Sequence, residues 1–449
     1  MSNGFKPYDR DQAFLLPPSM RDWLPAGDLA YFIVDVVETL DLREIEKYYR
    51  VGKAGSGQPP FHPRVMTALL LYAYSLGTPS SRQIARWCER DVGYRIVSAD
   101  QQPNFRTISE FRRIHLKALE RLFVQVLQMA DEAGLVNLGH VALDGTKVQA
   151  NASKHKAMSY GRMGEKEAQY VKEVDALLRR AQETDAAEDR QCGPDVRGDE
   201  LPEELRFREK RLAKIREAKA ALEARALEKA RAEGKLDADD QPIRSKGGRP
   251  PKTPPGTPEP KAQRNFTDPE SPIMKMGDGS FDQAYNCQAA VDAAHQIIVA
   301  QAATDAPNDK EQVVPMVDQI RRNLGRKPKR AIADSGYYSE HNVRGLRKRR
   351  IDDYLCPDRL KHGERPPPVR GRLPKGLAFI DLVRRKLLKK KGRLVYALRK
   401  QIVEPVFGQM KHVRGLRQFL LRGLAKVRGE WSLWCTTHNL LKLWTATTG

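Results

Sequence analysis

The sequence lacks the features that would place it in a membrane or outside the cell. No apolar stretch approaches the ~18 residues that a helix needs to cross a bilayer. The first residues, Met1 to Lys6, contain no apolar signal region. We therefore expect a cytoplasmic protein with no membrane partner.

Cysteine is also scarce. Its five positions are scattered and show no CxxC spacing: Cys88, Cys192, Cys287, Cys356 and Cys435. An odd number without paired spacing argues against both a disulfide framework and a zinc site. We expect these residues to be reduced, structural thiols.

Acidic residues are outnumbered by basic ones. The chain has 79 Lys and Arg against 57 Asp and Glu, a net charge of +22 and a pI near 9.7. The excess is concentrated, with five basic residues in 344–350 and seven in 384–393. Such runs neutralise backbone phosphates and make binding depend strongly on salt. The pattern favours a polyanion as partner, although a solvated basic face or a ribosome-type RNA binder is also compatible with it.

Against this basic background, two aspartates follow short apolar runs. Asp144 ends the run 140–144, and Asp334 ends the run 330–334. An apolar run that stops at a carboxylate close to a glycine is typical of a buried strand that delivers a ligand at its exit. One such aspartate is usually a solvated cap, but two of them followed by a suitably placed glutamate indicate a shared site.

The glutamate is Glu404, which precedes Pro405. Proline suits the first turn of a helix, so we expect Glu404 to lie at the positive end of a helix dipole. Lys411 follows seven residues later, about two turns along the same face, where it could hold a phosphate. Three carboxylates suit a pair of Mg²⁺ ions, with Mn²⁺ as a substitute, that support in-line attack on phosphorus.

These residues resemble those of the bacterial insertion-sequence DDE transposases. The stretches that carry the resemblance are 144–153, 282–292, 333–338 and 403–411. The resemblance implies an α/β fold: an RNase H-like mixed-sheet catalytic domain with an all-α N-terminal domain and an inserted helical hairpin. It also implies that Asp144, Asp334 and Glu404 are the catalytic residues and the metal ligands.

The same family carries a Tyr, Arg, Glu, Lys signature around its glutamate. Tyr396, Arg399 and Lys411 resemble the other members of this signature and would contact DNA. The gap between Arg399 and Glu404 is one residue longer than in the family pattern, which leaves the role of Arg399 open. The nearby Tyr337 is expected either to stack on a distorted DNA end or to anchor the turn after the second aspartate.

Downstream, the pattern predicts the element order of an RNase H-like domain. Strands are expected at 281–292, 296–304, 330–334 and 353–357, and helices at 309–324 and 340–350. With the strand before Asp144, the order is βββαβαβα, closed by the Glu404 helix. The first and fourth strands are neighbours in that fold, so Asp144 and Asp334 would share metals. A last helix, 430–444, is expected to pack on the catalytic helix without a catalytic role for Glu430.

The first ~135 residues predict helices only. One helix should start after Asp28, and Thr107 with Glu110 forms a capping box before a longer one. Between them, helices at 64–75 and 80–90 flank a break at 77–79, as in a helix-turn-helix. A plain helical hairpin fits the pattern equally well, and the resemblance favours binding to transposon ends.

The second helix of this pair has two distinct faces. The residues expected to face a DNA groove are its early polar ones: Ser81, Arg82, Gln83 and Arg86. Those expected to pack inward are Ile84, Trp87 and Cys88.

A region rich in Ala, Glu, Lys and Arg, 165–236, interrupts the catalytic pattern. Its apolar residues fall on heptad positions: Leu205, Leu212, Ile215, Leu222 and Ala226. A Gly-Pro segment after Cys192 divides the region into two helices, so we expect an antiparallel hairpin. It could dimerise, clamp DNA or pack on the core; an interrupted seam is usually intramolecular, which makes dimerisation the less favoured role.

A proline-rich linker follows at 247–258, with Arg249 in a Gly-Arg-Pro core. That core resembles an AT-hook, whose arginine enters a narrow minor groove, although a solvated linker is the simpler interpretation. The chain thus divides into three parts: a helical DNA-binding domain (1–135), a catalytic domain (136–160 and 266–449), and the hairpin with its linker (161–265).

Together these features predict a transposase that binds terminal inverted repeats and catalyses metal-dependent cleavage and strand transfer of double-stranded DNA. It would act in the bacterial cytoplasm, at the nucleoid, as a dimer on DNA because two ends must meet. The alternatives are an RNase H-like nuclease that does not join strands, and a non-catalytic DNA-binding derivative. The latter would be expected to have lost an acidic residue, and all three are present.

Overall fold

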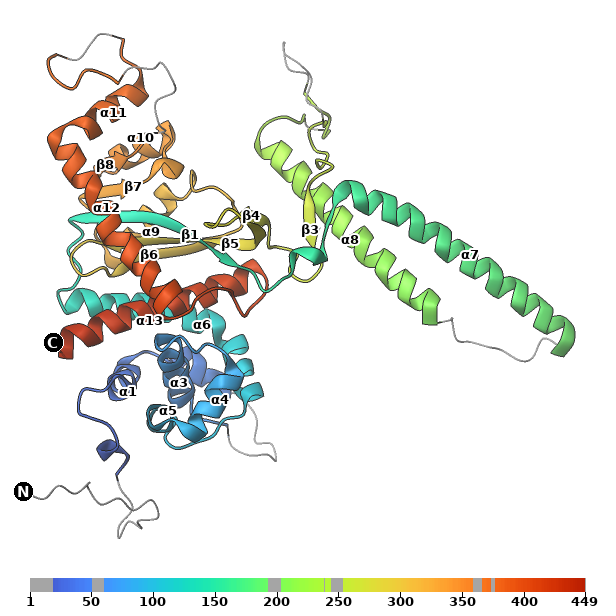
Figure 1. The fold of residues 1–449 in the computed structure, drawn as a ribbon, viewed down its shortest axis with the longest axis horizontal. Helices are drawn as coiled ribbons and strands as arrows, with labels where there is room; N and C mark the ends of the chain where they lie inside the picture. The colour runs from blue at the N-terminus through green and yellow to red at the C-terminus, as the bar shows by residue number, and fades with distance from the viewer. Residues whose placement is uncertain are drawn as a thin grey trace, which may run out of the picture.

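The computed structural model describes residues 19–50, 60–192, 203–237, 239–243, 253–357, 366–372 and 376–448. Figure 1 shows a central sheet covered by helices, a cluster of N-terminal helices beside it, and a long helical hairpin that projects from the sheet. Within the described ranges, no helix is both long and apolar enough to cross a membrane.

The sheet is mixed and has six strands: β1 (His140–Gln149), β4 (Ile273–Lys275), β5 (Phe281–Asp292), β6 (Ile298–Thr304), β7 (Arg330–Ala333) and β8 (Asp352–Leu355). Its order is β4-β5-β1-β7-β8, and β6 also pairs with β5. Strand β1 is antiparallel to β5 and parallel to β7, which is parallel to β8. The predicted mixed α/β fold is therefore confirmed, and so is the predicted contact between the first and fourth strands.

Small and apolar residues let the central strands be buried on both faces. All ten residues from Gln283 to Asp292 of β5 are buried, as expected for a strand that has helices on either side. In the pairing of β1 with β7, Leu143 is opposite Ala333. The residues that follow, Asp144 and Asp334, are therefore neighbours at the point where β7 ends and β1 continues.

The helices of the catalytic region are α9 (Val313–Leu324), α10 (Glu340–Lys348), α11 (Phe379–Leu388), α12 (Lys390–Gly408) and α13 (Leu424–Thr448). A π-helical turn, Gln409–Val413, continues α12, and short 3-10 helices lie at Met20–Asp22, Lys154–Lys156 and Ser335–Tyr337.

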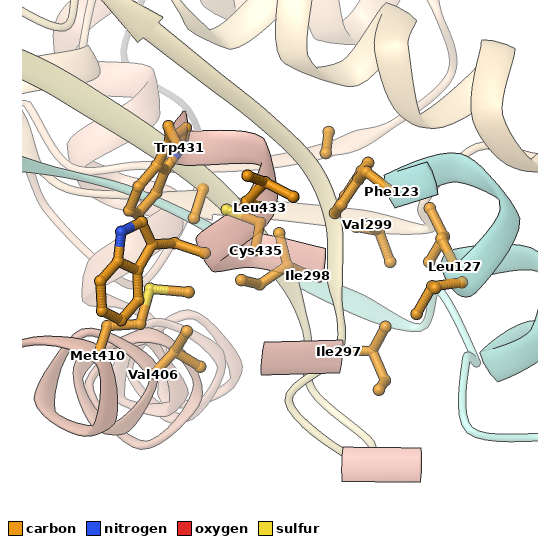
Figure 2. Close-up of a cluster of buried hydrophobic side chains, with 14 of the residues drawn as sticks. Phe123, Leu127, Ile297, Ile298, Val299, Val406, Met410, Trp431, Leu433 and Cys435 are labelled. Atoms are coloured by element: carbon orange, nitrogen blue, oxygen red, sulfur yellow. The ribbon is translucent and has the colours of Figure 1, made fainter. Parts of the chain in front are cut away.

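Helix α13 joins the central sheet to the N-terminal helices. It packs on β6, α6 and α3 and contains the predicted helix 430–444. Its Trp431 and Cys435 lie in the same buried cluster as Val406 and Met410, from α12 and the turn that follows it (Figure 2). Glu430 is buried and its carboxylate accepts hydrogen bonds from the backbone N–H groups of Leu420 and Leu421.

The N-terminal helices are α1 (Leu29–Thr39), α2 (Arg43–Arg50), α3 (Pro63–Ser75), α4 (Ser81–Arg90), α5 (Val92–Val97) and α6 (Phe105–Glu132). Asp28 caps α1 as predicted, because its Oδ1 accepts from the N–H of Ala30. The predicted capping box is wrong: α6 begins two residues before Thr107, because Asn104 accepts from the N–H of Arg106 and supplies an earlier N-cap.

The insertion forms a helical hairpin, as predicted, from α7 (Tyr160–Cys192) and α8 (Glu203–Ala232). At its base, β2 (Ala157–Ser159) pairs with β3 (Gln263–Asn265). Three of the heptad residues, Leu212, Ile215 and Leu222, are buried. The side chain of Leu205 and the AT-hook residue Arg249 lie outside the described residues.

Gly429 lies where α13 crosses α6 closely. A Cβ atom there would be 2.5 Å from Cγ of Leu116. We expect Gly429→Ala to lower the free energy of unfolding by about 1–3 kcal/mol, because overpacking displaces neighbouring atoms. The control is Gly408→Ala in α12, where no described atom is within 4 Å of the new Cβ and alanine should be neutral or stabilising. Thermal denaturation compares the two, and equal melting temperatures would contradict the close crossing.

Candidate active site

The two predicted aspartates lie side by side where β7 ends. The predicted strand exit at Asp144 is wrong, because β1 continues to Gln149 and stays paired with β5. Asp144 is in β1, and its Oδ1 accepts from the N–H of Gly145 at 2.9 Å. Asp334 follows β7 and caps a 3-10 turn, with Oδ1 2.9 Å from the nitrogen of Gly336. Burial raises the pKa of Asp144 to about 6 despite the opposing effect of Arg399, and the carboxylates of Asp334 and Asp309 act in the same direction as burial.

Glu404, on α12, is linked to this site by Arg399, which contacts both Glu404 and Asp144. The guanidinium of Arg399 lies 2.9 Å from Oδ2 of Asp144 and 3.8 Å from Oε1 of Glu404. The structure thus brings the three predicted acids to one place, despite the longer gap between Arg399 and Glu404. The side chain of Glu404 is 53% exposed whereas that of Asp144 is 18% exposed, so Glu404 forms the open side of the site.

The predicted helix start at Pro405 is wrong. Helix α12 begins at Lys390, and Pro405 lies inside it. Glu404 is therefore near the negative end of the helix dipole, and the positive charge beside it comes from Arg399 instead. Proline is tolerated because the carbonyl of Gln401, four residues earlier, accepts a hydrogen bond from Nε2 of Gln296 at 3.0 Å in place of the missing backbone N–H.

Tyr396 lies within α12, and Lys411 lies in the π-helical turn that follows it. Nζ of Lys411 donates to the backbone carbonyl of Lys147 at 2.8 Å, which ties the turn after α12 to β1. Burial lowers the pKa of Lys411. Tyr396 is half-buried beside Cys356, and burial with that thiol raises its pKa to about 12. Contact of either residue with phosphate remains a prediction.

Tyr337 anchors the turn after Asp334. Its ring is fully buried, and its hydroxyl donates to Oε1 of Gln288 on β5. In this conformation the ring is not accessible for stacking on a base, so the alternative role as an anchor describes the structure better.

His140 contacts Arg330, and His341 is exposed.

Helix α4 has the predicted exposed polar residues, with two corrections. Arg82, Gln83 and Arg86 are exposed. Ser81 is buried, and its hydroxyl accepts from Arg112. Trp87, predicted to pack inward, is 40% exposed, because the buried face of the helix is centred on Ser81, Ile84 and Cys88.

The turn before α4 is held against the loop that follows the catalytic helix. Gly77 has a φ of +73°, and a Cβ there would lie 2.3 Å from the carbonyl oxygen of Arg414. Only glycine permits this approach. The helix pair α3–α4 is therefore in direct contact with the segment that carries Lys411.

Three polar residues of the site have no role assigned from the sequence. Asp309, in the connection between β6 and α9, accepts hydrogen bonds at Oδ1 from Asn286 at 2.7 Å and Gln288 at 2.6 Å. The sequence marks the stretch 282–292 only as part of a resemblance, and Asp309 falls at the expected start of a helix, where an aspartate usually indicates a cap. Only their shared location beside Asp144 in the folded structure reveals Asp309, Asn286 and Gln288 as a group.

The carboxylates suit a hard cation such as Mg²⁺. They do not form a finished cage: within the described ranges, no group of three or more His, Cys, Asp or Glu could hold a metal ion as placed. Arg399 instead supplies the positive charge between Asp144 and Glu404. The residue types fit a divalent metal by the chemistry of their donors, since the carboxylates of Asp144 and Glu404 meet at one guanidinium and offer hard oxygen ligands.

Comparison with known families identifies the class of protein. A family model described as "Transposase DDE domain" matches residues 233–440, and one described as "Transposase domain (DUF772)" matches residues 18–113. Together they span most of the chain, which belongs to the insertion-sequence DDE transposases. The first match starts after β1, so the placement of Asp144 rests on the geometry above. No curated protein and no solved structure matches the chain.

Proposed function

We propose that this transposase binds the terminal inverted repeats of its insertion sequence, hydrolyses a phosphodiester at each end, and joins the released 3′-hydroxyl to target DNA. The observation that carries the proposal is that Arg399 contacts both Asp144 and Glu404, while the pairing of β1 with β7 places Asp334 beside Asp144. When bound there, two Mg²⁺ or Mn²⁺ ions would activate the attacking oxygen and stabilise the leaving one.

The chain's own residues would prepare the site and position the DNA. Arg399 neutralises Asp144 before DNA binds and then turns to a backbone phosphate, a contact for which its forked donors are suited. Lys411 would contact a phosphate beside the site. Asp144 and Asp334 are held by the rigid sheet. The DNA would therefore move to place the phosphodiester beside them.

Outside the active site, DNA would bind to basic surfaces of the protein. Arg82, Gln83 and Arg86 on α4 would read the ends, and the basic runs 344–350 and 384–393 would neutralise phosphates. A role of Arg249 in the minor groove belongs to the same proposal. Since two ends must meet, the protein would act as a dimer on DNA, in the bacterial cytoplasm at the nucleoid.

The exposed face of α4 gives a measurable test of end binding. We expect the double variant Arg82→Ala/Arg86→Ala to bind end DNA more weakly, and the slope of log K against log salt to fall by about 0.9 for each phosphate that the variant no longer neutralises. Fluorescence anisotropy at several salt concentrations, with end and scrambled duplexes, measures both. The control is Arg121→Ala on α6, an exposed arginine paired with Glu44. Equal slopes for all three proteins would place the DNA-binding residues elsewhere.

The function itself is tested with labelled DNA from the element's own ends in Mg²⁺, Mn²⁺ or EDTA. The proposal predicts cleavage and joining that depend on the metal. Cleavage without joining would favour the nuclease alternative. End binding without either reaction would favour the non-catalytic derivative.

A further inference from the structure

We propose that Asp309 is a fourth carboxylate of the metal site, an inference that rests on the function proposed above. Asp309 lies in the connection between β6 and α9. This connection leaves the sheet at the end where Asp144 and Asp334 are found. Three features of Asp309 support the assignment: the way it is held, the position of its second oxygen, and the space beside it.

One oxygen of Asp309 is fixed by a network of amides. Oδ1 accepts from Nδ2 of Asn286 and from Nε2 of Gln288. Nε2 of Gln288 also donates to Oδ1 of Asn286 at 3.0 Å, and Oε1 of Gln288 accepts from the buried hydroxyl of Tyr337. These partners determine which way each amide faces, so the carboxylate has a defined orientation before any ligand arrives.

The other oxygen of Asp309, Oδ2, lies near Asp334. Among the described residues, none donates a hydrogen bond to it. A Cβ atom built on Gly336 would be 3.1 Å from Oδ1 of Asp334 and 3.3 Å from Oδ2 of Asp309. Both carboxylates therefore lie close to Gly336 and to each other. Carboxylate oxygens gathered in this way are the ligands that a hard divalent cation prefers.

Glycines leave the space between these carboxylates open. A Cβ on Gly145, directly after Asp144, would be 2.9 Å from Oδ1 of Asp309 and 2.5 Å from Nε2 of Gln288. Both catalytic aspartates are thus closely followed by a glycine on the side that faces Asp309. A side chain at either position would push Asp309 away from the site.

Holding this carboxylate near two others is unfavourable without a cation. Three carboxylates repel one another in a partly buried site, and nothing in the described structure pairs Asp309 with a basic side chain. The hydrogen bonds from Asn286 and Gln288 nevertheless fix Asp309 in place. Such an unfavourable arrangement is expected where function requires it. Removing the negative charge of Asp309 should therefore weaken metal binding. Without metal, it should leave the stability of the fold unchanged or raise it.

The test compares Mn²⁺ binding by the full chain and its Asp309→Asn variant, measured by electron paramagnetic resonance of free Mn²⁺, with end DNA present. Asparagine keeps the size and the hydrogen-bond acceptor. We expect Mn²⁺ affinity to fall roughly 10- to 100-fold. In EDTA the variant should melt at the wild-type temperature or above it, which also shows that it folds. The control is Asp305→Asn in the same connection, whose carboxylate pairs with Arg225, and it should bind Mn²⁺ normally.

A second variant tests the space rather than the charge. Gly336→Ala keeps every carboxylate but places a methyl group between Asp309 and Asp334, and it should also weaken Mn²⁺ binding. Wild-type Mn²⁺ affinity in both Asp309→Asn and Gly336→Ala, with loss of binding in Asp334→Asn, would overturn the role of Asp309 and leave the proposed function standing. If the wild-type protein bound no Mn²⁺ on end DNA, the proposed function would fail and this inference with it.

Discussion

Replacing Asp334 with Asn is expected to lower the rates of DNA cleavage and of joining roughly 10³-fold or more. Asparagine fills the same space and can still cap the turn at Gly336, so the fold should be unchanged. What it lacks is the negative charge that a divalent metal requires of its ligand. The loss should therefore be in chemistry and not in binding of the ends.

Two measurements on the same protein separate these effects. Single-turnover assays on labelled ends give the rates, and anisotropy gives the affinity for the same DNA. A matched control is Asp318→Asn on α9, which removes a surface pair with Arg349 and should leave both quantities near wild type. Cleavage by Asp334→Asn at more than a tenth of the wild-type rate would remove Asp334 from the catalytic site.

The second large effect distinguishes the two glutamates of the C-terminal region. Glu404→Gln should abolish cleavage and joining to a similar degree without changing the melting temperature. Its side chain is 53% exposed, and its ion pair with Arg399 is long at 3.8 Å, so this contact adds little to stability.

Glu430→Gln is expected to have the opposite profile. Glu430 is buried and accepts backbone hydrogen bonds from Leu420 and Leu421. An amide NH₂ group cannot accept them, so the free energy of unfolding should fall by about 1–3 kcal/mol. The residual folded protein should cut DNA at the wild-type rate. Thermal melts and cleavage assays on both variants make the comparison, and an active Glu404→Gln or an inactive but stable Glu430→Gln would reverse the assignment.

The parts of the fold that follow from local pattern could be predicted from the sequence. Apolar runs that end at Asp144 and Asp334 set two strands, and parallel pairing carries both aspartates to one place. The strand 281–292 is predicted with the bounds that the structure has, although polar residues such as Asn286 and Gln288 interrupt its small and apolar side chains. The hairpin is predictable because its apolar spacing is helical and a Gly-Pro segment interrupts it.

The parts that depend on distant partners could not be predicted. Pro405 suggests a helix start, and only the side chain of Gln296 from the turn before β6 allows it inside α12. Asp309 resembles a helix cap until folding brings Asn286 and Gln288 beside it. Trp87 is apolar, yet its place on the helix puts it at the edge of the buried face.

The central claim is that Asp334 binds a catalytic metal, and a change of ligand tests it most directly. In Asp334→Cys a soft thiolate replaces a hard carboxylate, and thiolates bind Mn²⁺ better than Mg²⁺. Joining of labelled ends should be absent from this variant in Mg²⁺ and measurable in Mn²⁺, while the wild-type protein is active in both. Joining by the variant at the wild-type rate in Mg²⁺ would contradict metal binding by Asp334.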